Sequence, residues 1–180
     1  MPRTVAFLRA INVGGHTVRM QDLRAHFEAL GLVNVETFIA SGNVIFESRA
    51  RDLAGLGRRI ESHLHAQLGF EAHTFLRSEA EVAAIAGHAP FTPALCEQAG
   101  FLGVGFLSTT PDAATVRAVH ALRTDSDELE LHGRELWWLC RGRQSDSTLS
   151  NAVFEKTLKQ RSTVRNITTV RKLAALCAER

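Results

Sequence analysis

The chain has 180 residues, of which 45% are hydrophobic and 22% charged, and its formal net charge is +2. This composition is typical of a globular protein and excludes a disordered or collagen-like chain, and so small a net charge does not by itself indicate nucleic acid or a membrane. No apolar run approaches the roughly 20 residues that a membrane helix needs, and Arg9 interrupts the short run from Val5 to Leu8. We therefore expect no signal peptide and no membrane association.

The first 90 residues predict strands and helices in the order β-α-β-β-α-β-α. Periodic apolar positions indicate the helices, and Gly31 and Gly69 follow two of them as helix-ending glycines do. The turn composition Ser41-Gly42-Asn43 separates the second and third strands. The expected strands are 4–9, 35–40, 44–47 and 71–76, and the expected helices are 20–30, 53–68 and one that starts at the capping-box pattern 78–81.

A linker at 87–100, rich in glycine and proline, precedes a second set of elements. Thr110 is the expected N-cap of the next helix, with Pro111 and Asp112 in its first turn. Gly133-Arg134 indicates the turn of a hairpin. The expected strands are 101–107, 129–132, 135–140 and 163–165, and the remaining expected helices are 149–158 and 170–177.

The two halves repeat the same topology. Val5-Ala6-Phe7-Leu8 corresponds to Val104-Gly105-Phe106-Leu107, and Phe75-Leu76-Arg77-Ser78 corresponds to Thr163-Val164-Arg165-Asn166. Each half matches the split β-α-β unit of ferredoxin-like folds. We therefore expect an α+β protein made of two ferredoxin-like halves, residues 1–90 and 91–180, packed together because each half alone has a thin core.

Three cysteines, Cys96, Cys140 and Cys177, are widely spaced and include no CxxC pair. This pattern indicates neither a zinc site nor a disulfide framework, and it favours reduced thiols in a cytoplasmic protein. His63 and His65 lie about 200° apart around an expected helix, so they cannot converge on one metal. We expect no metal and no cofactor.

The stretch FLRAINVGG, residues 7–15, carries the first candidate site. The first two strands of a split β-α-β unit are parallel, so the loop from Arg9 to Gly15 and the Ser41-Gly42-Asn43 turn should lie at one edge of the sheet. Adjacent glycines can turn backbone N–H groups onto a ligand, and Arg9 can offer two donors to a carboxylate or phosphate. These features predict a polar cradle.

Structural alternatives remain open for the same residues. Asn12 and the glycines can make a tight strand-to-helix turn, and Arg9 can pair with a structural carboxylate. Ser41-Gly42-Asn43 can be a simple hairpin turn, and Asn166 can be the N-cap of the last helix. Neither a P-loop nor a GxGxxG motif is present.

The blocks FLRAINVGG, MQDLRAHFEALG, SGNVIFES and TVRNITTVRKLAAL resemble, in this order, the signature of the family called domain of unknown function 1697. The resemblance spans essentially the whole chain and implies two related α+β subdomains, with no established activity. Ala10, Ile167 and Thr168 stand where the family usually has glycine, tryptophan and asparagine. The matching polar positions are Arg9, Asn12, Gly14, Gly15, Ser41, Gly42, Asn43, Thr163, Arg165, Asn166 and Thr169.

Four functions remain open. The first is binding of a small anionic or polar ligand, with Arg165, Asn166 and Thr169 adding to the glycine loop. The second is nucleic-acid binding, since residues 141–180 carry 9 Arg/Lys against 3 Asp/Glu, and Phe7 and Phe46 could stack on bases. The third is an enzyme acting on a phosphorylated or acylated substrate, although no nucleophile or base is identified. The fourth is self-assembly through an open sheet face.

Overall fold

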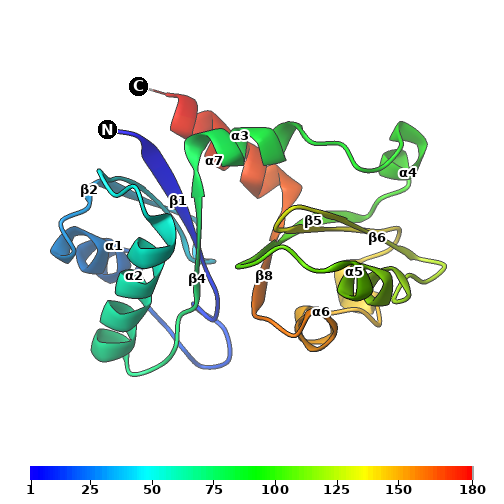
Figure 1. Cartoon of the computed structure of the whole chain (residues 1–180), viewed down its shortest axis with the longest axis horizontal. Helices are drawn as coiled ribbons and strands as arrows, with labels where there is room; N and C mark the ends of the chain where they lie inside the picture. The colour runs from blue at the N-terminus through cyan, green and yellow to red at the C-terminus, as the bar shows by residue number, and fades with distance from the viewer. Residues whose placement is uncertain (180) are drawn as a thin grey trace. The chain divides into compact units, whose positions relative to one another are not determined.

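The computed structural model describes residues 1–179 and divides the chain into two compact units (Figure 1). Among the described residues, the first unit comprises 1–86 and 171–179, and the second comprises 87–170. The last helix, α7 (Ile167–Ala178), therefore begins in the second unit and ends in the first. The division of the sequence at residue 90 stays a prediction.

The first unit contains one four-stranded antiparallel sheet in the order β2-β3-β1-β4. Its element order is the predicted one, with strand, helix, two strands, helix, strand and helix. The bounds are β1 (Arg3–Leu8), α1 (Met20–Ala29), β2 (Val33–Phe38), β3 (Asn43–Glu47), α2 (Leu53–Leu68), β4 (Thr74–Ser78) and α3 (Glu79–Gly87).

Helices α1 and α2 cover one face of this sheet (Figure 1). Leu23 and Phe27 on α1, and Ile60 on α2, are fully buried against strand residues such as Phe46. Their three- and four-residue spacing is that of one helix face, which is why periodicity alone located both helices. Burial of this apolar surface is the main stabilising contribution to the unit.

The second unit repeats the architecture, with a sheet in the order β6-β7-β5-β8. Helices α5 and α6 cover one face, where Val119 and Phe154 pack with Trp138. The bounds are α4 (Pro93–Glu97), β5 (Phe101–Leu107), α5 (Ala113–His120), β6 (Asp127–His132), β7 (Glu135–Cys140), the 3₁₀ turn η1 (Gln144–Asp146), α6 (Asn151–Leu158) and β8 (Ser162–Asn166). The predicted α+β fold with two similar halves is thus confirmed.

The register of β1 with β4 matches that of β5 with β8 residue by residue. Val5 pairs with Arg77 between β1 and β4, and Val104 pairs with Arg165 between β5 and β8. These are the correspondences that the sequence predicted between the halves. Both arginines are buried, and neither belongs to the apolar cluster under the helices of its unit.

Helix α7 begins at Ile167, three residues earlier than expected, and two further helix assignments differ from the expectation. Helix α5 begins after Asp112, whose side chain accepts a hydrogen bond from the Thr115 N–H at 2.8 Å, so Asp112 and not Thr110 is the N-cap. The expected linker contains the short helix α4, because Thr92 caps it and Pro93 occupies its first turn.

A buried carboxylate ties the hairpin of the second unit to the segment that follows it. Asp127 accepts hydrogen bonds from the indole Nε1 of Trp138 at 2.8 Å, from the hydroxyl of Thr124 at 2.7 Å and from the hydroxyl of Ser147 at 2.9 Å. Burial by itself would raise the pKa of Asp127, but these donors outweigh it and the pKa is lowered.

We therefore expect Asp127→Asn to lower the free energy of unfolding by about 2 kcal/mol at pH 7, because the charged acceptor is lost. A lowered folded-state pKa stabilises the protein above the ordinary pKa of 3.8, and that contribution disappears as the pH falls through the folded-state value. Urea unfolding followed by tryptophan fluorescence should show the difference at pH 7 and its narrowing below pH 4. Asp125→Asn, at an exposed position in the same turn, is the control and should change little. A difference that persists undiminished in acid would contradict the role of the charge.

Candidate functional site

The loop after β1 and the bend after β2 lie side by side, as the strand order predicted. Strands β1 and β2 both run antiparallel to β3, so both end at the same edge of the sheet. The Leu8 N–H donates to the carbonyl of Gly42 at 2.8 Å, and the side-chain Nδ2 of Asn12 donates to the carbonyl of Ala40 at 2.7 Å. We call residues 9–15 and 39–43 together the rim.

The side chain of Asn12 joins the two segments of the rim. Besides its bond to Ala40, its Oδ1 accepts a hydrogen bond from the Val18 N–H at 2.7 Å. Its backbone φ is +55°, a conformation that asparagine tolerates better than most residues. Both ends of the amide are thus engaged within the protein, which supports the structural alternative for this residue.

Ser41 and Asn43 shape the bend. Asn43 is fully buried, and its Nδ2 donates to the carbonyl of Phe38 and to the hydroxyl of Ser41, both at 3.0 Å. Gly42 has a φ of +79°, and a Cβ there would lie 3.1 Å from the Cβ of Leu8 and 3.0 Å from that of Ile11. Glycine is therefore required at this position both by the backbone conformation and by the close packing of the loop.

Gly14 and Gly15 form an open turn. Their φ angles of +59° and +84° place both central residues in the left-handed region, as in a type I′ turn, and the His16 N–H donates to the carbonyl of Val13 at 3.0 Å. The space where either Cβ would stand is empty to 4 Å. Among residues 1–179, no acceptor takes the N–H of Gly14 or of Gly15.

Backbone strain is concentrated at the rim. Of the eleven described residues with positive φ, six lie there, and two of these are not glycine or asparagine: Ala10 at +66° and Ile39 at +51°. A β-branched residue in this region is unusual, and Ile39 is also 51% exposed. Strained conformations of this kind are found preferentially at functional sites.

Arg9 lies at the end of β1 and is half-buried, and its backbone N–H donates to the carbonyl of His73 at 2.8 Å. The other predicted site residues belong to the second unit. Arg165 on β8 is buried, which lowers the pKa of its guanidinium to about 10, and its Nη1 donates to the hydroxyl of Thr163 at 2.7 Å.

The Asn166 Oδ1 accepts from the Thr168 N–H at 2.9 Å at the start of α7, which supports its capping role. Thr169 lies on the same helix and is half-buried. Ligand contacts by Arg165, Asn166 and Thr169 stay predictions.

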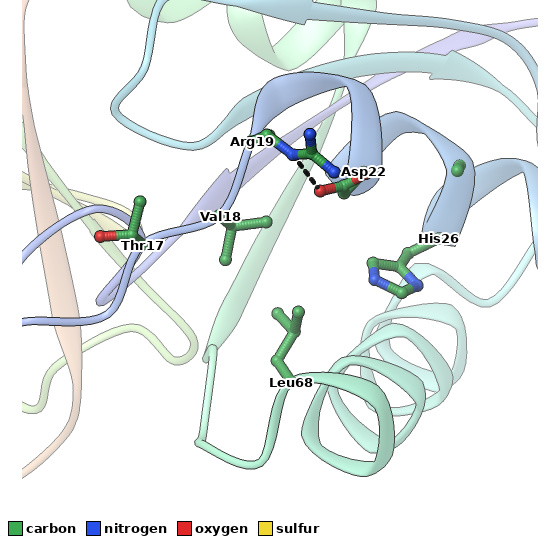
Figure 2. A pocket seen from close by; sticks show the side chains of 7 residues that line it. Thr17, Val18, Arg19, Asp22, His26 and Leu68 are labelled. Atoms are coloured by element: carbon green, nitrogen blue, oxygen red, sulfur yellow. Dashed lines mark hydrogen bonds and ion pairs between the residues drawn. The ribbon is translucent and has the colours of Figure 1, made fainter.

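A pocket of about 380 Å³ lies between the start of α1 and the end of α2, and the sequence did not predict it (Figure 2). Val18, Ala25 and Leu68 give it apolar walls, while Arg19, Asp22 and His26 are its charged or titratable lining residues. Leu68 is 50 positions from Val18 along the chain, so no local motif marks this site. The pocket begins only a few residues after the glycine turn.

Phe7 and Phe46, which the nucleic-acid hypothesis would place on an open sheet, are both 0% exposed. Neither ring is available to stack on a base in this structure. Within residues 1–179, no group of three His, Cys, Asp or Glu side chains is placed to hold a metal ion. None of the helices in the same range combines the length and the apolar character needed to cross a membrane.

Comparison with known proteins gives a family and a fold. The model of a family described as "Protein of unknown function (DUF1697)" matches residues 1–137. The solved structure of the conserved bacterial protein SP0830 from Streptococcus pneumoniae is similar, with a TM-score of 0.76 and 24% sequence identity over 99% of each chain. No curated protein matches the sequence. At this identity the structural likeness establishes the shared fold alone.

The packing at Gly42 generates a prediction for the rim. We expect Gly42→Ala to lower the free energy of unfolding by about 3 kcal/mol, because the new Cβ adds a clash with Leu8 and Ile11 to the backbone strain. Gly31→Ala is the matched control, since Gly31 has the same φ of +79° but nothing within 4 Å of its Cβ position, and it should cost only about 1 kcal/mol. Urea denaturation of both variants measures the difference. Equal losses would mean that the close packing at Gly42 contributes nothing.

Proposed function

The chain belongs to the DUF1697 family of proteins of unknown function, and we propose that it binds a small anionic or polar ligand at the glycine turn of its first unit. The observation that carries this proposal is the pair of adjacent N–H groups at Gly14 and Gly15, which have no acceptor among the described residues. Successive backbone N–H groups exposed in a turn can form a concave site that attracts anions.

The turn is fixed before a ligand arrives, which supports binding at a low entropic cost. Asn12 holds the chain on one side of the turn through its bonds to Ala40 and Val18. On the other side the ring of His16 stacks on Phe70, with 4.1 Å between ring centroids. A ligand would therefore meet donors that are already oriented.

Arg9 is the proposed source of positive charge, because a guanidinium can offer two parallel donors to a carboxylate or phosphate. It lies in the same short loop as the glycines, at the end of β1. In this proposal Arg9 neutralises the charge of the ligand, and the two backbone N–H groups orient the ligand.

Two finer assignments accompany this proposal. The sheet order β2-β3-β1-β4 and its repetition in the second unit support the description of each half as ferredoxin-like. Cys96, Cys140 and Cys177 are free thiols, which fits the reducing cytoplasm that the sequence predicts.

The test titrates ¹⁵N-labelled protein with inorganic phosphate at constant ionic strength, followed by a thermal-shift panel of nucleotides and organic carboxylates. We expect the Gly14 and Gly15 amide resonances to move, since their N–H groups take the anion. Arg9→Ala should weaken the binding of any ligand found by about tenfold. Arg51→Ala, at an exposed position in the same unit, should leave the affinity unchanged.

Two results would overturn the proposal. One is that no probe moves the two glycine amides or raises the melting temperature. The other is that every bound ligand has the same affinity for Arg9→Ala as for the unaltered protein.

A further inference from the structure

The pocket between α1 and α2 is lined in part by apolar side chains. Val18 is 5% exposed and Leu68 is the last residue of α2 (Figure 2). Ala25, an exposed residue of α1, also lines the pocket. A volume of about 380 Å³ lies within the range of small-molecule sites. A short hydrocarbon group would gain free energy by leaving water for these walls.

Arg19 already holds a carboxylate at this pocket. Its Nε donates to Oδ2 of Asp22 at 2.8 Å, and its Nη2 lies 3.5 Å from Oδ1 (Figure 2). This is the two-pronged geometry in which an arginine recognises a carboxylate. The contact with Asp22 thus shows the two-donor geometry with which Arg19 can take the carboxylate of a bound molecule.

Replacing the ion pair between Arg19 and Asp22 by a contact of Arg19 with a ligand costs little free energy of folding. The side chains of Arg19 and Asp22 are 79% and 46% exposed, and a pair so open to water contributes little to stability. Arg19 can therefore turn from Asp22 to a ligand with almost no loss of folding free energy. Asp22 then acts as an internal competitor for the same guanidinium.

His26 also lines the pocket. Its ring meets that of His63 edge to face, with 5.4 Å between centroids, and the Nε2 of His63 is buried without a hydrogen-bond partner. Desolvation and the neighbouring His63 lower the pKa of His26, while Asp22 acts in the opposite direction. His26 is therefore neutral near pH 7 and can donate or accept one hydrogen bond within the pocket.

We propose that this pocket binds a small organic acid that carries one carboxylate and a short apolar chain. Arg19 takes the carboxylate, and Val18, Ala25 and Leu68 take the chain. A single guanidinium next to the negative charge of Asp22 suits a monoanion better than a phosphate dianion, which Asp22 would repel more strongly. The site is distinct from the glycine turn and does not depend on it.

The experiment is a two-dimensional NMR titration of ¹⁵N-labelled protein with acetate, butyrate and hexanoate at pH 7 and constant ionic strength. We expect the amides of Val18 and Ala25 to shift, and the affinity to rise about two- to fourfold for each added methylene that is buried. Arg19→Gln should reduce the affinity for hexanoate about tenfold. Asp22→Asn should raise it, by about two- to threefold, because it removes the competitor.

Helix α1 offers a matched control. Arg24 and Glu28 form an ion pair with the same 2.8 Å Nε–oxygen distance one turn further along, outside the pocket. Arg24→Gln and Glu28→Gln should leave hexanoate binding unchanged. The proposal is overturned if Arg19→Gln binds hexanoate as tightly as the unaltered protein, if Asp22→Asn gives no gain, or if acetate, hexanoate and phosphate bind equally well.

The pH dependence provides a second readout. Protonation of His26 adds a positive charge to the pocket, so hexanoate should bind more tightly once the pH falls through the lowered pKa of His26, and His26→Gln should remove this gain. A dependence that survives in His26→Gln would overturn the role of that residue. The pocket proposal and the glycine-turn proposal can fail independently of each other. The Arg9→Ala variant and the amide resonances of Gly14 and Gly15 report on the turn alone.

Discussion

One side chain, that of Asn12, holds together the part of the first unit on which its candidate sites depend. Its amide spans two segments that are almost 30 residues apart, with the nitrogen bonded to Ala40 and the oxygen bonded to the amide of Val18. Through these bonds the glycine turn and the bend at residues 39–43 form one fixed edge of the sheet. The strained φ angles of Ala10 and Ile39 persist because this edge is held from both sides.

The strand order and the helices could be predicted from the sequence because they depend on local periodicity and on the few ways in which a split β-α-β unit can be connected. Helix α2 has the expected bounds, and the registers of β1 with β4 and of β5 with β8 agree with the alignment of the two halves. The N-cap at Asp112 was missed because Thr110 and Asp112 are both good capping residues, and only the path of the chain decides between them.

The candidate site was predicted in part. The topology predicted that the glycine loop and the bend meet at one edge of the sheet. It did not predict that the side-chain amides of Asn12 and Asn43 donate to backbone carbonyls. The sequence of a loop does not show whether an asparagine in it binds a ligand or the chain itself. No sequence motif indicated the pocket at α1. It exists because Leu68 ends α2 beside the start of α1, and such an encounter is set by helix packing and not by any motif.

Helix α7 has a consequence for the biosynthesis of the protein. Residues 171–178 complete the first unit, where the guanidinium of Arg3 donates to the carbonyl of Leu176. The strands of that unit are translated before the second unit, whereas residues 171–178 are translated after it. The first unit is therefore complete only once residues 171–178 have been made, whereas the second unit has all of its strands once β8 has been made.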